Sequence, residues 1–379
     1  MGDPVTGGSE HDQDRPVLRV GVVGAGNISG QYFQAVPRLT NLRITAIADL
    51  DADRAAAAAA DVPGARVAKP EELYTADDVD LVLNLTIPAV HAEVAHAAIA
   101  AGKHVYGEKP LAATTAEARA VLAAAENAGV RVGCAPDTVL GTGIQTARAA
   151  LDAGDIGVPV AATAFMVTPG HERWHPAPEF YYRPGGGPLL DMGPYYLTAL
   201  VTLLGPVKRV VGMSSTAQQT RTVGSGPRAG TVFPVEVETH VTGVLEHVNG
   251  ALSTLVMSFE VWAGNLPRIE VYGSRGSLGV PDPNGFDGEV RIFRAEAKEW
   301  EPVPELGGYR NASRGYGVSD LARASAEGRP HRANGELAFH VLDVMESLLA
   351  AAKSGESVTV GSTCERPEAV PAAARPEEQ

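Results

Sequence analysis

The 379-residue sequence has little of three features that would each point to a particular class of protein. It holds two cysteines, Cys134 and Cys364, too few for a disulfide framework or a cysteine-based zinc site. No apolar run approaches the roughly 18 residues that a membrane-spanning helix needs. The first 16 residues carry neither the basic nor the apolar stretch of a secretion signal. We therefore expect a cytoplasmic protein with no membrane partner.

Positive charge is also in short supply. The chain has 31 lysines and arginines against 45 aspartates and glutamates, for a net charge of −14. Nucleic acids bind to basic surfaces, so this balance argues against a nucleic-acid partner. The hydrophobic share of 45% is ordinary for a globular protein, and the length suggests two domains at about 150 residues each.

The N-terminal part of the chain alternates short apolar runs with helical patterns. We expect strands at 17–23, 42–48, 80–85, 104–106 and 130–135. We expect helices at 28–38, 51–60, 89–101 and 114–128. Strands that alternate with helices predict a parallel sheet with helices on its faces.

After about residue 150 the pattern changes to longer strands that are joined by tight turns. We expect strands at 158–168, 208–216, 237–248, 251–262, 268–278 and 289–295, then helices at 318–327 and 335–353. Asn249-Gly250 lies between two of these strands and is the strongest hairpin signal in the chain. This part therefore predicts a mainly antiparallel sheet.

A glycine motif opens the first helix. It reads Gly24-Ala-Gly26-Asn27-Ile28-Ser29 and directly follows the first strand. Gly24 permits a tight turn, Gly26 allows the backbone to approach a pyrophosphate, and the helix start offers free N–H groups. Gly24, Gly26, Asn27 and Ile28 are therefore predicted to bind a dinucleotide. The alternative is an ordinary turn between a strand and a helix.

Asp49 ends the second strand, where a carboxylate can accept hydrogen bonds from the hydroxyls of the adenosine ribose. The same carboxylate would repel a 2′-phosphate, so we expect NAD, with NADP possible. Arg54 would favour NADP if it reached that phosphate, but we place it on the exposed face of the next helix.

Two further segments resemble a known family. Thr86-Ile-Pro88-Ala-Val-His91 follows the predicted strand at 80–85, and Glu108-Lys109-Pro110 follows the strand at 104–106. Together they resemble the glucose–fructose oxidoreductase / inositol dehydrogenase (Gfo/Idh/MocA) family of NAD(P)-dependent enzymes. The resemblance implies that Thr86, Pro88, His91, Glu108 and Lys109 lie at the cofactor.

The resemblance also implies a domain organisation. We predict an α/β protein with an N-terminal Rossmann domain at 17–137 that binds NAD(P). A C-terminal α+β domain at 138–362 would carry a large open, mainly antiparallel sheet for substrate binding and oligomerisation. The segments 1–16 and 363–379 lack periodicity and are expected to be flexible tails. The family further implies a homo-oligomer, either a dimer or a tetramer.

Lys109 is the first catalytic candidate. Pro110 fixes the local backbone and favours an extended Lys109, which could aim the ammonium group into the cleft at the carboxyl edge of the sheet. Hydride transfer from a secondary alcohol also releases the hydroxyl proton. A cation that is hydrogen-bonded to that oxygen would stabilise the alkoxide-like transition state.

Asp191 and Tyr195 are the other catalytic candidates. They match a family element, Asp-x-Gly-x-His or Asp-x-Gly-x-Tyr, in its tyrosine version. The resemblance implies that Tyr195 moves the proton while Asp191 orients Lys109 or the sugar. Pro194 complicates this reading: a helix that begins near Asp191 would make Asp191 an N-cap, and one that begins at Pro188 would be kinked. Tyr195 could also serve only in packing, with Tyr196 as a rival for its role.

An aromatic loop precedes this element. His171, Trp174 and His175 are predicted to bind substrate, since aromatic faces stack on sugar rings and imidazoles hydrogen-bond hydroxyls. A metal site of His171, His175 and Glu179 is an alternative that we do not adopt, so no metal is expected. A packed loop without a ligand is a second alternative.

These observations predict an NAD(P)-dependent dehydrogenase. It would transfer hydride between the nicotinamide and a ring carbon of a sugar, cyclitol or glycoside. One alternative is an NAD-dependent glycosidase that oxidises its sugar transiently. Another is a non-catalytic sensor that binds the cofactor.

Overall fold

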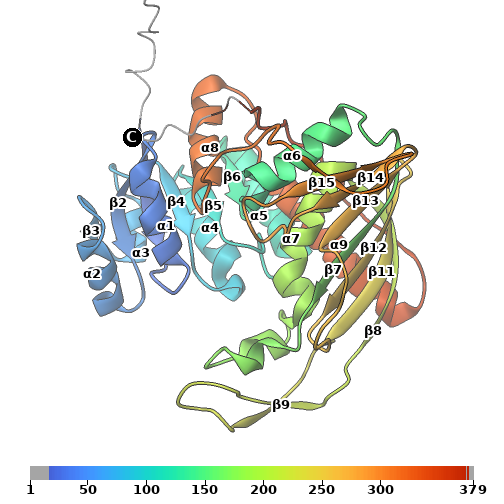
Figure 1. The fold of residues 1–379 in the computed structure, drawn as a ribbon. Coiled ribbons are helices and arrows are strands. Elements are labelled where there is room, and N and C mark those ends of the chain that lie inside the picture. Colours follow the sequence, from blue (N-terminus) through green and yellow to red (C-terminus); the bar gives the residue numbers. More distant parts are fainter. Residues whose placement is uncertain (1–16, 373, 375–379) are drawn as a thin grey trace, which may run out of the picture.

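A computed structural model describes residues 17–372 and 374 of the chain (Figure 1). The strands of this described part form a six-stranded sheet, a nine-stranded sheet and a two-stranded ribbon. The predicted α/β fold, with a parallel sheet first and a mainly antiparallel sheet second, is confirmed. The predicted tail at 1–16 lies outside the described residues.

The six strands of the first sheet are all parallel and lie in the order β3-β2-β1-β4-β5-β6. They are β1 (Leu18–Val23), β2 (Leu42–Ala48), β3 (Arg66–Val67), β4 (Leu81–Asn84), β5 (His104–Gly107) and β6 (Val132–Cys134). Strand order reverses between β1 and β4, and ligands of such sheets bind beyond the carboxyl ends of the strands at this point.

Five helices pack around the first sheet (Figure 1). They are α1 (Ser29–Ala35), α2 (Ala52–Ala60), α3 (Pro70–Tyr74), α4 (His91–Ala100) and α5 (Thr115–Ala128). Four of them were expected, and α3 was not. The helix predicted at 28–38 becomes α1 followed by one 3₁₀ turn, η1 (Val36–Arg38), which places Pro37 in that turn.

The second sheet has the order β16-β15-β14-β13-β7-β12-β11-β8-β17, and only β7 and β12 pair in parallel. Its long strands are β7 (Pro159–Val167), β8 (Val207–Ser215), β11 (His240–His247) and β12 (Leu252–Ser258). The shorter ones are β13 (Ile269–Gly273), β14 (Gly276–Val280), β15 (Val290–Arg294), β16 (Glu301–Val303) and β17 (Val358–Thr359). The two-stranded ribbon is β9 (Thr220–Thr222) with β10 (Val232–Pro234).

The tight turns of the second sheet follow from local chemistry. Gly250 has a φ of +90°, which favours glycine, and it closes the predicted hairpin of β11 and β12. The strand that was predicted at 268–278 is two strands, because the chain reverses at Ser274-Arg275 and β13 pairs with β14.

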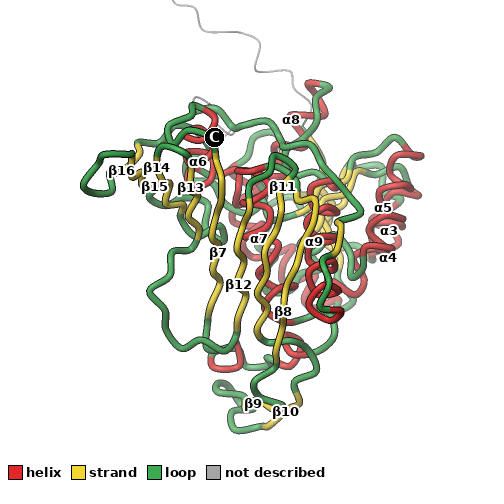
Figure 2. Tube along the Cα trace, turned by 90° about the vertical axis from the view of Figure 1, so that its right-hand side faces the viewer, coloured by secondary structure: helices red, strands yellow, loops and turns green. Residues whose placement is uncertain are grey.

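Helices cover one face of the second sheet. They include α7 (Gly187–Leu204), α9 (Gly335–Ser354) and α6 (Thr142–Asp152), which packs against β14 and β15 (Figure 1). The helix α8 (Tyr316–Glu327) instead contacts β2 and β6 of the first sheet. The opposite face turns toward the viewer in Figure 2, with the helices behind the strands. Apolar side chains are exposed on this outer part of the sheet; they include Val211, Met213, Val244 and Leu252.

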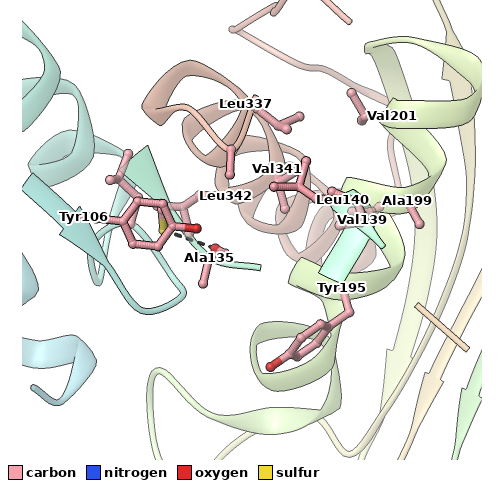
Figure 3. Packing of buried hydrophobic residues seen from close by; sticks show 14 of the residues in the cluster. Tyr106, Ala135, Val139, Leu140, Tyr195, Ala199, Val201, Leu337, Val341 and Leu342 are labelled. Atoms are coloured by element: carbon pink, nitrogen blue, oxygen red, sulfur yellow. Dashed lines mark hydrogen bonds between the residues drawn. The ribbon is translucent and has the colours of Figure 1, made fainter. Parts of the chain in front are cut away.

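One apolar core runs through both halves. Figure 3 shows the packing of Leu337, Val341 and Leu342 of α9 beside side chains of α7 and the segment after β6. Tyr195 points away from this packing. The two sheets are therefore joined by a shared core, and the side chains at their junction are held by it.

The segment after β17 differs from the expected flexible tail. In its described part, Val370 is buried and its N–H donates to Gln145 Oε1 at 2.8 Å. Arg366 pairs with Asp152 at 2.6 Å, and the Arg332 guanidinium donates to the Glu368 carbonyl. These long-range contacts hold residues 363–372 against the body, which composition alone could not indicate.

None of the described helices combines the length and apolar character needed to cross a bilayer.

Candidate active site

A cleft of about 900 Å³ lies beyond the carboxyl ends of β1, β2 and β4. Four residues predicted from the sequence line it: Gly24, Gly26, Asp49 and Thr86. Arg54 lines it too, although we placed it on an exposed helix face. The cleft thus gathers the β–α loops of three neighbouring strands at the strand-order reversal.

The two glycines of the motif do different things. Gly24 has a φ of +100°, and a Cβ there would meet the Leu85 carbonyl oxygen at 2.7 Å, so the turn requires glycine. A Cβ on Gly26 would meet no atom within 4 Å. Packing therefore does not explain Gly26, whereas open space above its backbone fits the approach of a pyrophosphate group.

Asp49 supports the loop that carries these glycines. Its Oδ2 accepts the Ala25 N–H at 2.8 Å and its Oδ1 accepts the Asp51 N–H at 2.9 Å. Arg54 Nη1 lies 3.5 Å from Oδ1, so the arginine faces the carboxylate rather than solvent alone. Asp49 is in the cleft wall, where the sequence placed it, and each of its oxygens already has a backbone donor.

Of the other cofactor candidates at the first and fourth strands, only Thr86 lines the cleft. Asn27 is exposed and Ile28 half-buried, both at the start of α1. Thr86 donates its hydroxyl to Asn84 Oδ1 at 2.6 Å, which fixes the loop after β4. Pro88 is exposed and begins the 3₁₀ turn η2 (Pro88–Val90).

His91 is held inside the protein, and its place at the cofactor stays a prediction. It is buried, its Nδ1 lies 2.7 Å from the Pro110 carbonyl, and its Nε2 lies 3.0 Å from the Thr86 carbonyl. Both ring nitrogens thus face backbone oxygens, and His91 does not line the cleft. It ties the loop after β4 to the segment that carries Lys109.

Glu108 is also turned inward. Its Oε1 accepts the Tyr32 hydroxyl at 2.8 Å and its Oε2 accepts the Lys109 N–H at 3.1 Å. Tyr32 lies on α1, so the carboxylate connects the helix after the glycine loop to the backbone of Lys109. Below this segment the buried Cys134 thiol donates to the Glu108 carbonyl at 3.6 Å.

Asp191 lies between two of the predicted site residues. Lys109 Nζ donates to the Asp191 carbonyl at 2.6 Å and to its Oδ1 at 3.0 Å, and His171 Nε2 lies 3.0 Å from Oδ2. The three side chains are between 13% and 18% exposed, so they are shielded but reachable. Lys109 follows β5, His171 lies in the loop after β7, and Asp191 lies in the first half of α7.

The electrostatics favour the charged forms of Lys109 and Asp191. Burial alone would raise the pKa of Asp191, but the Lys109 charge and the His171 hydrogen bond outweigh it and lower that pKa to about 2. Burial alone would lower the pKa of Lys109, but the charges of Asp191 and Tyr195 raise it to about 12. Lys109 and Asp191 are therefore an ion pair throughout the neutral pH range.

Helix α7 begins at Gly187, so Asp191 lies inside the helix and is not its N-cap. Pro194 lies in the interior and removes an N–H that would otherwise bond the carbonyl four residues earlier. Asp191 and Tyr195 stay on one side of the helix, as their spacing of four predicts.

Tyr195 meets a residue that the sequence analysis missed. The Arg314 Nη2 donates to Tyr195 Oη at 2.7 Å, and both side chains are buried. Lys109 Nζ lies 5.3 Å from the centroid of the Tyr195 ring. Arg314 lies in a loop just before α8 with no motif around it, so no sequence signal could have found it.

Tyr196 is not a rival at this site. It is fully buried, and burial together with the Asp282 charge raises its pKa. Asp282 and Arg268 are its charged neighbours, far in sequence from the Lys109 segment.

The predicted substrate loop forms an aromatic cluster. The His171 ring lies 5.4 Å from Trp174 and 4.5 Å from Phe259, and the His175 ring lies 5.4 Å from Trp174. Trp174 is 58% exposed and presents an apolar face to solvent. Glu179 pairs instead with Arg228, and within residues 17–372 and 374 no three acidic, histidine or cysteine side chains gather for a metal.

Comparisons with known proteins agree with this geometry. Residues 18–135 match the oxidoreductase family with an NAD-binding Rossmann fold, and residues 144–279 match the GFO/IDH/MocA C-terminal domain. A 1,5-anhydro-D-fructose reductase of Ensifer adhaerens is 32% identical over 69% of this chain and 74% of its own length. A dTDP-3,4-didehydro-2,6-dideoxy-alpha-D-glucose 3-reductase of Streptomyces violaceoruber is 30% identical over 84% of this chain and 92% of its own length.

Solved structures share the fold. A levoglucosan dehydrogenase in complex with NADH and L-sorbose superposes with a TM-score of 0.77 over 91% of this chain and 99% of its own, at 22% identity. The two matched family models and the two curated relatives together give the classification. The chain belongs to the Gfo/Idh/MocA family of NAD(P)-dependent oxidoreductases.

Proposed function

We propose that this protein is a dehydrogenase or reductase of a sugar, cyclitol or glycoside, and that it works on a ring carbon. The observation that carries the proposal is the Lys109–Asp191–His171 cluster, which lies after the carboxyl end of β5. Relatives named as sugar reductases and as inositol 2-dehydrogenases support the substrate class.

NAD is the proposed cofactor. The open space above Gly26 and the position of Asp49 in the cleft wall support it. A carboxylate at this point disfavours a 2′-phosphate, although Arg54 at 3.5 Å from it would offset part of that repulsion if NADP were bound. When bound, the nicotinamide supplies the atom that accepts or donates the hydride.

The lysine is proposed to hold the reacting oxygen of the substrate. A lysine ammonium has three N–H donors, and Lys109 gives one to the Asp191 carbonyl and one to its carboxylate. The third remains for the substrate hydroxyl or carbonyl. Its positive charge would stabilise the negative charge that develops there during hydride transfer. Asp191 orients Lys109 in this scheme.

Tyr195 is proposed to exchange the proton. In the oxidative direction an ionised Tyr195 would accept the hydroxyl proton of the alcohol, and in the reverse direction it would return that proton to the carbonyl oxygen. Trp174, His171 and His175 are proposed to form the wall on which the sugar ring lies, with Trp174 offering an exposed face.

The test is a substrate panel. Purified protein is mixed with NAD or NADP and with free sugars, inositols and glycosides, and the absorbance of reduced nicotinamide is followed. We expect a rise with one class and one cofactor. Net hydrolysis of a glycoside without an absorbance change would support the glycosidase instead. No turnover together with no measurable binding of either cofactor would overturn the proposal and leave a different function.

Self-association is part of the proposal. The uncovered face of the second sheet, with Val211, Met213 and Val244 exposed, is the surface on which two copies would pack (Figure 2). Light scattering of the wild type and of Met213→Glu would test this, and a monomeric wild type would contradict it. A cytoplasmic location, also proposed, agrees with the free thiols of Cys134 and Cys364 and is testable by cell fractionation.

A further inference from the structure

A buried arginine lies against the proposed proton-transfer residue. The Arg314 side chain is 8% exposed, and its only hydrogen bond within the described part of the chain joins Nη2 to Tyr195 Oη at 2.7 Å. That length is typical of a hydrogen bond assisted by charge. Because Arg314 has only donors, Tyr195 Oη is the acceptor, and the phenol proton stays available for another partner.

The two nearby carboxylates form ion pairs with Arg314 but accept no hydrogen bond from it. Arg314 Nη1 lies 3.7 Å from Asp137 Oδ1 and 4.0 Å from Glu108 Oε1, both beyond hydrogen-bond range. Asp137 satisfies its other oxygen with the N–H groups of Gly315 and Gly317, at 3.0 Å each. An arginine that served only to neutralise these carboxylates would donate to them. Instead its one short bond goes to the tyrosine.

The charged groups around Tyr195 come from four parts of the fold. Lys109 lies over the ring after β5, Arg314 lies at the hydroxyl before α8, and Asp191 lies one turn earlier on α7. Glu108 and Asp137 form ion pairs with Arg314. Burial raises the pKa of the nearby Tyr181, and the charge of Tyr195 adds to that rise. Among the residues that the structure describes, Arg314 is the one cation whose hydrogen bond ends on the phenol oxygen.

We propose that Arg314 is a positioning residue for the proton transfer: its guanidinium holds Tyr195 Oη and stabilises the phenolate that forms when Tyr195 gives up its proton. This deepens the proposed function and rests on it for the role of Tyr195 in turnover. In the oxidative direction Tyr195 would begin as the phenolate: the substrate O–H bond breaks and the Tyr195 O–H bond forms, and the nicotinamide, when bound, would supply the hydride acceptor. Arg314 keeps its own protons throughout.

The arrangement also links the two halves of the site. Glu108 accepts from Tyr32 on α1 and from the Lys109 backbone, and Arg314 stands between Glu108 and Tyr195. These contacts connect the Tyr195 hydroxyl to α1, the helix that follows the glycine loop. Removal of Arg314 should affect the proton step more than the affinity for the cofactor.

The first experiment titrates Tyr195 without cofactor or substrate. The ultraviolet band of tyrosinate is followed with pH in the wild type, and the part that is lost in Tyr195→Phe gives the midpoint of Tyr195. We expect Arg314→Gln to raise that midpoint by about one pH unit or more. Arg314→Lys keeps the charge but not the planar fork, so it should raise the midpoint less. Arg310→Gln is the matched control, since Arg310 is exposed and pairs with Glu305.

The second experiment uses turnover. Arg314→Gln should lower kcat at neutral pH at least about tenfold and move the pH profile of alcohol oxidation upward, with little change in KM for the cofactor. In a Tyr195→Phe background the same substitution should change the remaining rate by less than about twofold, because Arg314 acts through Tyr195. Near-ultraviolet circular dichroism verifies the fold of each variant.

An unchanged Tyr195 midpoint in folded Arg314→Gln would overturn the inference. If that variant does not fold, an unchanged midpoint in Arg314→Lys would overturn it instead. An equal loss of rate in the two backgrounds would also count against it, because it would indicate a merely structural role. A failure of the proposed function would be recognised separately. The wild type would then turn over no substrate of the panel, while the titration of Tyr195 would still show whether Arg314 affects its hydroxyl.

Discussion

The cleft proposed for the cofactor and the Lys109–Asp191–His171 cluster proposed for catalysis are built in opposite ways. The cleft is made of backbone at β–α turns, where Gly24 and Gly26 carry no side chain and Asp49 holds the loop through its carboxylate. The cluster is made of side chains from distant segments, with Lys109, His171 and Asp191 meeting at 3.0 Å. Substitutions that add a side-chain atom at a glycine should therefore disturb the cleft, whereas substitutions that remove a polar group should disturb the cluster.

The largest effect should follow removal of the lysine ammonium. Lys109→Met keeps the length of the side chain but loses its donors and charge, so turnover should fall by about a thousandfold or more. Cofactor affinity should change far less, because the cleft lies on backbone groups. Steady-state rates and cofactor titration measure the two quantities. Lys208→Met, at an exposed lysine of β8, is the control, and an active Lys109→Met would contradict the mechanism.

A second effect concerns pH: the stability of the fold should depend on pH in a range where the charges of the Lys109–Asp191 pair do not change. Burial lowers the pKa of His331 and of His340 from the ordinary 6.5 to about 4. The unfolded chain therefore takes up protons first as the pH falls, and stability is lost between about pH 6.5 and pH 4, by up to about 3 kcal/mol for each histidine. The Lys109–Asp191 pair keeps its charges through this range, since the pKa of Asp191 is about 2.

Urea denaturation at about pH 7 and about pH 5 checks this slope. His340 Nε2 accepts the Val207 N–H at 2.9 Å, so His340→Gln should lower stability at neutral pH and also flatten the pH dependence. A slope that His340→Gln leaves unchanged would assign the acid sensitivity to other groups.

A third effect tests the turn of the cleft. Gly24→Ala places a Cβ 2.7 Å from the Leu85 carbonyl oxygen at a φ of +100°, and both costs act on the folded state. We expect a loss of about 2 kcal/mol in the free energy of unfolding. Chemical denaturation measures it. A variant as stable as the wild type would show that the loop can relax away from Leu85.

The smallest effect tests the neighbouring glycine. A Cβ on Gly26 meets no protein atom, so Gly26→Ala should leave the free energy of unfolding within about 0.5 kcal/mol of the wild type. It should nonetheless weaken NAD binding about tenfold, because the methyl group enters the space proposed for the pyrophosphate. Calorimetric titration measures this. Unchanged affinity would mean that the cofactor lies elsewhere in the cleft.

The same contrast explains what could be predicted from the sequence. The glycine turn, Asp49 and the Lys109-Pro110 step are short patterns whose effect is local. Gly24 and Asp49 line one cleft, and their contact with a cofactor stays a prediction. The Tyr195–Arg314 bond spans 119 positions, and no local pattern announces it. His91 belongs to a local motif, yet its contacts depend on Pro110, 19 residues away, so its inward orientation was missed. The packing of residues 363–372 was missed for the same reason.

The thiol of Cys134 gives this enzyme an internal reporter. Burial raises its pKa and keeps it protonated, so alkylating reagents reach it only when the edge of β5 and β6 opens. The same edge carries Glu108 and precedes Lys109. In a Cys364→Ser background, the labelling rate of Cys134 would report how often this edge of the first sheet opens, and how far the proposed cofactor and substrate each slow that opening.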